Sequence, residues 1–126
     1  MKRVTGIGGI FFKSADPGRL GAWYRDHLGL DVTDWGGAVF SWGGPESSPG
    51  MTIWSPFAQD TDYLEPSSAP FMINFRVADL DALLAALRAE GCHVIDRTET
   101  SEQGKFGWVM DPDGNKIELW EPPVGQ

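Results

Sequence analysis

Cysteine and basic residues are scarce in this 126-residue sequence. Cys92 is the sole cysteine, so no disulfide can form within the chain, and we expect a reducing, cytoplasmic location. Ten Lys and Arg residues stand against 18 Asp and Glu residues, which gives a formal net charge of −8. The basic residues form no block, so nucleic acid and membrane surfaces are disfavoured as partners.

Long hydrophobic runs are missing as well. No apolar stretch approaches the roughly 18 residues that a membrane helix needs. The N-terminal segment MKRVTGIGGIFFK is too short and too interrupted by glycine for a secretory signal. An apolar fraction of 41% over this length suits one soluble domain with its own hydrophobic core.

The sequence contains an internal repeat. The segment IFFKSAD at 10–16 matches INFRVAD at 73–79, at an offset of 63 residues. Further along, FSW at 40–42 matches FGW at 106–108, and WSP at 54–56 matches WEP at 120–122, both at an offset of 66. Because the matches keep the same order, we expect each half to build the same supersecondary unit.

Both halves predict the element order β-α-β-β-β. Apolar runs at 5–12 and 71–77 are typical of strands, and each is followed by apolar residues at helical spacing. The turn at 111–115 predicts a hairpin between the last two strands. The shorter strands are expected at 31–34, 38–42 and 51–55 in the first half, and at 93–96, 105–110 and 116–120 in the second.

Helix boundaries are marked in both halves. Asp16 and Asp79 are expected N-caps, and Pro17 suits the first helical position. Gly29 and Gly91 stand where a left-handed residue would end each helix.

The stretch between the halves is rich in Pro, Ser and Asp, which is typical of a linker. We therefore expect a single domain, residues 1–126, in which module one spans 1–57, the linker 58–70 and module two 71–126. A linker of this length would permit either a side-by-side or a swapped homodimer.

Three segments resemble the vicinal oxygen chelate superfamily: WYRDHLGL at 23–30, FRVADLDALLAALRAEG at 75–91 and DPDGNKIELWEPP at 111–123. This superfamily includes glyoxalase I, bleomycin-resistance proteins, extradiol dioxygenases and methylmalonyl-CoA epimerase. The resemblance implies an α+β fold of two tandem βαβββ modules that form a curved mixed sheet, and a homodimer. In the enzymes a divalent metal lies in the concave sheet, bound by the first and last strand of each module. The fold does not decide the function.

The resemblance implies metal-ligand positions at Gly9 in the first strand and Glu118 in the last, and the repeat carries these to Met72 and Thr52 in the other module. Three of these residues are not usual ligands of a divalent ion, and a catalytic zinc site needs about three protein ligands. We therefore predict no tightly bound metal and no other cofactor, with Glu118 as the one candidate catalytic residue.

Strand alternation predicts which side chains line the concave face. The expected ligand-binding residues are Phe11, Trp42, Thr52, Trp54, Met72, Asn74, Arg76, Trp108 and Trp120. Such a mixture of aromatic and polar groups is typical of a pocket for a flat or amphipathic small molecule.

Two functions fit this interpretation. The first is a metal-free protein of the bleomycin-resistance type that binds an aromatic or amphipathic small molecule in a Trp-rich cup. The alternative is a glyoxalase-, lyase- or dioxygenase-type enzyme that acts on a carbonyl or vicinal-oxygen substrate. In that enzyme Glu118 would be the acid/base or the sole retained metal ligand. The missing ligands favour the first function.

Overall fold

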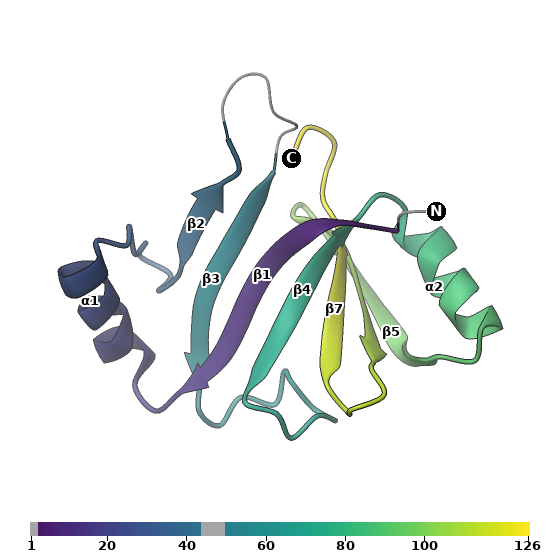
Figure 1. The fold of residues 1–126 in the computed structure, drawn as a ribbon, viewed down its shortest axis with the longest axis horizontal. Coiled ribbons are helices and arrows are strands. Elements are labelled where there is room, and N and C mark those ends of the chain that lie inside the picture. Colours follow the sequence, from purple (N-terminus) through teal and green to yellow (C-terminus); the bar gives the residue numbers. More distant parts are fainter. Residues whose placement is uncertain (1–2, 44–49) are drawn as a thin grey trace.

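The computed structural model describes residues 3–43 and 50–126. The elements in chain order are β1 (Val4–Ser14), α1 (Pro17–Leu28), β2 (Ala38–Ser41), β3 (Met51–Ala58), β4 (Phe71–Val77), α2 (Leu80–Ala89), β5 (His93–Ser101), β6 (Gly104–Met110) and β7 (Lys116–Glu121). In the described ranges the strands form one curved sheet with the order β2-β3-β1-β4-β7-β6-β5, and the two helices lie toward its two sides (Figure 1). The predicted α+β class with a mixed sheet is confirmed.

The two halves of the chain meet at the centre of the sheet. β1 and β4 pair antiparallel, with Ile10 opposite Ile73. Within each half the first strand pairs in parallel with the last, β1 with β3 and β4 with β7. The internal repeat therefore corresponds to a repeated strand connection, and one chain contains the whole concave face.

The predicted helix boundaries are confirmed. Asp16 and Asp79 are N-caps whose side chains each accept a hydrogen bond of 3.1 Å from the backbone N–H three residues later. Pro17 is the first residue of α1. Gly29 ends α1 with a φ of 71°, and Gly91 follows α2 with a φ of 82°. Neither helix of the described chain is long and apolar enough to cross a membrane.

One predicted strand is wrong. Residues 31–34 form no strand, because the backbone closes into a local turn. The N–H and the hydroxyl of Thr33 both donate to the carbonyl of Gly37, at 2.8 and 2.9 Å, and Gly36 has a φ of 95°. The first module is therefore βαββ in the described ranges. β5, by contrast, extends beyond its predicted end to Ser101 because it pairs with β6.

The apolar side chains form a core on each face of the sheet. Beneath α2, the buried residues are Val77, Leu80, Leu83, Leu84, Val109 and Leu119. On the concave face, Leu64, Met72 and Trp108 form a second buried cluster. Leu64 belongs to the segment 58–70, so the stretch expected to be a linker packs onto the concave face instead of only spanning the modules.

Candidate functional site

A cavity of about 590 Å³ opens on the concave face of the sheet. Its apolar walls are Phe11, Trp35, Met51, Ile53, Phe106 and Trp120. Its polar groups are Ser55, Asn74, Gln103, Glu118 and Gln126, and Gly8 completes the lining. The cavity therefore draws on both modules, with a predominantly apolar surface and a few polar groups.

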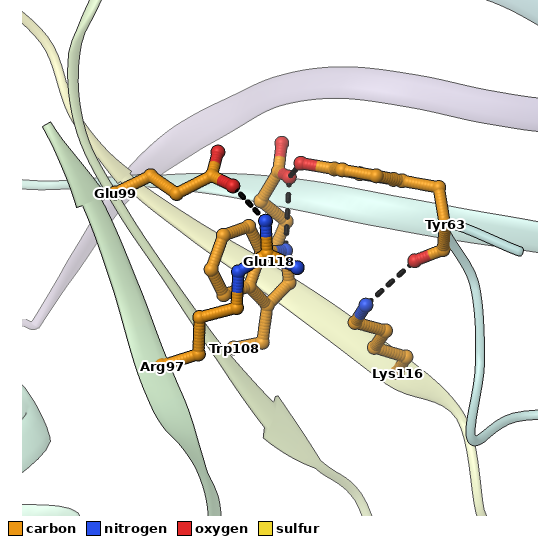
Figure 2. Close-up of polar contacts among 6 residues, drawn as sticks. All are labelled: Tyr63, Arg97, Glu99, Trp108, Lys116 and Glu118. Carbon is orange, nitrogen blue, oxygen red and sulfur yellow. Dashed lines mark hydrogen bonds and ion pairs between the residues drawn. The ribbon is translucent and has the colours of Figure 1, made fainter. Parts of the chain in front are cut away.

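Glu118 is the most buried ionisable group of the cavity wall, with 3% of its surface exposed. Its Oε1 accepts a hydrogen bond of 2.7 Å from the side-chain amide of Asn74. Its Oε2 accepts one of 3.0 Å from the indole N–H of Trp108 and another from the hydroxyl of Tyr63 (Figure 2). Three donors from different elements thus stabilise one buried carboxylate.

Tyr63 was missed by the sequence analysis because it lies in the segment interpreted as a linker. Burial, and then the adjacent charge of Glu118, raise the pKa of the Tyr63 phenol far above its ordinary value. The phenol therefore stays protonated and donates to Glu118. The one sequence signal was the pair Tyr63–Leu64, a large aromatic and an aliphatic residue inside an otherwise polar stretch.

Two cations hold the residues around Glu118. The Lys116 ammonium donates to the carbonyl oxygen of Tyr63 at 2.6 Å and lies 5.3 Å from the ring centroid of Trp108. The Arg97 guanidinium lies 5.5 Å from the same centroid and pairs with Glu99 (Figure 2). Burial lowers the pKa of Lys116. These contacts fix the indole and the phenol that donate to the carboxylate.

Glycines in β1 allow the close approach of the central strands. The pairing of β1 with β4 shifts between Ile7 and Gly9, which leaves Gly8 as the extra residue of a bulge. A Cβ atom on Gly8 would lie 2.3 Å from Oδ1 of Asn74, and one on Gly9 would lie 2.7 Å from the ring of Phe11. The space at the predicted ligand position Gly9 is thus bounded by an aromatic ring.

The structure corrects the position in β3 that corresponds to Glu118. Ile10 of β1 lies beside Trp54 of β3. In the second module its repeat partner, Ile73, lies beside Ile117, the residue before Glu118. Ser55, which follows Trp54, is therefore the counterpart of Glu118 in the first module. Thr52 is not, because the local WSP match shifted the assignment by three residues.

An odd shift in a strand reverses the face that each side chain occupies. Thr52 and Trp54 were expected to line the cup, and neither is among the residues that line the cavity. The Trp54 ring packs against Tyr24 of α1, with centroids 4.7 Å apart. The Thr52 hydroxyl donates to the carbonyl oxygen of Ile7 at 2.6 Å and accepts a hydrogen bond of 2.8 Å from the indole N–H of Trp42. Ser55, with 8% exposure, lines the cavity instead.

The other residues expected at the site divide into three groups. Phe11, Asn74 and Trp120 line the cavity with Glu118. Met72 and Trp108 face the same side but are 0% and 1% exposed, because they pack with Leu64. Arg76 and Trp42 lie together beside the cavity, with 4.9 Å between the guanidinium carbon and the indole centroid.

Two tandem modules joined through β1 and β4, with a cavity on the concave face, define a fold of the glyoxalase, bleomycin-resistance and dioxygenase superfamily. The family model described as glyoxalase-like domain matches residues 9–120, and the chain belongs to this family.

Solved structures share the fold. A methylmalonyl-CoA epimerase from Mycobacterium tuberculosis is 24% identical with a TM-score of 0.66, covering 98% of this chain and 91% of its own. A Streptomyces coelicolor epimerase variant in complex with 2-nitronate-propionyl-CoA is 21% identical with a TM-score of 0.70, covering 96% and 99%. A superfamily member from Vibrio splendidus 12B01 is 14% identical with a TM-score of 0.59, covering 91% and 97%. No curated protein matches the sequence.

Proposed function

We propose that this protein binds an aromatic or amphipathic small molecule in the concave-face cavity, without the help of a metal ion. One observation carries the proposal: in an apolar-walled cavity, both carboxylate oxygens of Glu118 already accept hydrogen bonds from protein donors. Tyr63, Asn74 and Trp108 thereby stabilise the carboxylate. A cation bound to Glu118 would have to displace these hydrogen bonds.

The aromatic walls support a flat ligand. Phe106 and Trp120 stack with an interplanar angle of 7° and centroids 6.2 Å apart. Phe11 stacks on Phe57 at 5.2 Å. Rings held in this way present rigid apolar faces to a ligand, and a cavity of about 590 Å³ matches the size of ordinary small-molecule sites.

The four family positions support binding without metal. In this chain they hold Gly9, Ser55, Met72 and Glu118, and Met72 is fully buried against Leu64. Within residues 3–43 and 50–126, no three His, Cys, Asp or Glu side chains are grouped as a metal site would require. One carboxylate and one hydroxyl do not fit the ligand set of a divalent ion.

Titration calorimetry with a neutral flat probe, 2-naphthamide, tests the proposal. We expect a Kd in the micromolar range that is unchanged by EDTA. Phe106→Ala removes a cavity wall and should weaken binding at least tenfold. Trp23→Ala removes an exposed aromatic side chain from α1 and serves as the control. Absence of binding, or binding only after a divalent ion is added, would refute the proposal.

A second candidate function is favoured by the contact between Tyr63 and Glu118 together with the epimerase neighbours. In this case Glu118 would take a proton from a carbon next to a carbonyl group and return it. Deuterium incorporation into methylmalonyl-CoA in D₂O, measured by mass spectrometry in EDTA, distinguishes the two functions. Exchange that is present in the wild type and lost in Glu118→Gln would establish the enzyme, and no exchange would leave the binding protein.

A further inference from the structure

Arg76 is a buried cation next to the cavity. It comes from β4 on the same face as Asn74, and 6% of its surface is exposed. Its guanidinium carbon lies 4.9 Å from the ring centroid of Trp42 and 5.1 Å from that of Trp120. Two indoles therefore shield this charge from solvent.

The hydrogen bonding of this guanidinium is incomplete. Nη2 donates to the main-chain oxygen of Gln126, the last residue of the sequence, whereas Nη1 is buried and has no partner. Within residues 3–43 and 50–126, no Asp or Glu side chain forms an ion pair with Arg76. Indole rings attract a cation but do not replace the oxygen acceptors that guanidinium N–H groups require. A buried guanidinium in this state is stabilised strongly by an incoming anion.

The cation lies directly behind the cavity wall. Two of the residues that Arg76 contacts, Trp120 and Gln126, line the cavity. Gln126 is itself exposed, and Val124 beside it is fully exposed, so the main-chain oxygen that covers Arg76 belongs to a segment with little packing. A ligand oxygen can therefore take the place of that main-chain oxygen without disturbing the core.

A second unpartnered atom lies at the same corner. Oδ1 of Asn74 is buried and accepts no hydrogen bond. A Cβ atom on Gly8 would lie 2.3 Å from this Oδ1 and 3.0 Å from Cγ of Arg76, so both side chains converge on the bulge glycine. Asn74 and the aliphatic part of Arg76 thus flank the same bulge glycine, and the unpartnered Oδ1 is left for a donor group of a ligand rather than for its carboxylate.

We propose that Arg76 forms an anion subsite and that the ligand is an aromatic acid whose carboxylate replaces the main-chain oxygen of Gln126 on the guanidinium. The proposal rests on the binding function above and specifies the chemical class of the ligand. The aromatic part lies against Trp120 and Phe106, and the carboxylate extends toward β4. The net charge of −8 opposes anions at long range, so the preference is local to this subsite.

Calorimetry with two probes of the same shape tests the subsite. 2-Naphthoate carries the carboxylate, and 2-naphthamide replaces it with a neutral amide. We expect the acid to bind at least tenfold more tightly than the amide. This preference should disappear in Arg76→Met and persist in part in Arg76→Lys. Arg19→Met, which removes the same charge from the exposed surface of α1, should leave it unchanged.

The outcomes separate this inference from the binding function. Equal affinity for acid and amide in the wild type would overturn the anion subsite and leave the cavity as a binding site. No binding of either probe would overturn both. If Arg76→Met fails to fold in a urea titration, the wild type and Arg76→Lys still decide. A wild type without the preference, or an Arg76→Lys variant that keeps it in full, would overturn the role of the guanidinium.

Discussion

The hydroxyl of Tyr63 donates to Glu118, although the two residues are separated by 55 positions in the chain. The contact joins the segment between the modules to the last strand of the sheet. It brings a stretch with the composition of a linker against the concave face, and it supplies one of the three donors around the carboxylate.

Glu118→Gln is expected to destabilise the fold by about 2–3 kcal/mol, because the amide places N–H groups against donors that now bond to oxygen. The free energy of unfolding in urea measures the change. Glu99→Gln serves as the control, since Glu99 pairs with Arg97 near the surface and its loss should cost less than about 1 kcal/mol. Equal losses in the two variants would show that the buried network adds no stability.

Tyr63→Phe removes one donor from Glu118 and tests the raised pKa of Tyr63. In the unfolded chain the phenol ionises near pH 10, whereas in the folded chain it stays protonated above that pH. The stability advantage of the wild type over Tyr63→Phe should therefore be present below pH 10 and shrink above it. The limiting slope is about 1.4 kcal/mol per pH unit. Urea titrations of both proteins from pH 8 to about pH 11 measure this advantage. A stability difference between the two proteins that does not change with pH would contradict the burial of the phenol.

Gly8→Ala is expected to lower stability by about 1–3 kcal/mol and to weaken ligand binding, because the added methyl group collides with Asn74 and Trp120. Gly18→Ala in α1 is the matched control. Its Cβ atom would have Asp16 as its nearest neighbour at 3.8 Å, so the helix should tolerate it or gain slightly. Thermal unfolding and calorimetry with 2-naphthamide report the two effects. Unchanged binding in Gly8→Ala would place the ligand elsewhere.

Leu64→Ala is expected to cost about 2–4 kcal/mol, since the Leu64 side chain is fully buried against Met72 and Trp108. Val124→Ala, at an exposed position, should change the free energy of unfolding by less than about 0.5 kcal/mol. Similar stabilities for the two variants would mean that the segment 58–70 is a passive connection.

Much of the fold could be predicted because its signals are local. Asp16 and Asp79 cap their helices through bonds to residues three positions away, and alternation along β4 and β7 brings Asn74 and Glu118 to one face. The strand expected at 31–34 failed for a local reason too. The N–H and the hydroxyl of Thr33 bond within a turn instead of to a neighbouring strand. The alternation of apolar residues does not reveal this preference for a turn.

The site was less predictable than the fold. The short match of WSP with WEP suggested Thr52 as the counterpart of Glu118, whereas the pairing of β1 with β3 selects Ser55. Shifting the assumed register of β3 by three residues assigns each of its side chains to the opposite face of the sheet. Residues of the helix side are then mistaken for residues of the cavity.

The sequence by itself determined the repeated modules, the helix boundaries and the single carboxylate among the four family positions, because caps and strand alternation act over a few residues. The tertiary structure alone decided that Tyr63 reaches Glu118, that Ser55 lines the cavity and that Arg76 lies between two indoles. These contacts depend on strand register and on the packing of distant segments, where the free energy of burying apolar surface selects among arrangements that are locally equivalent.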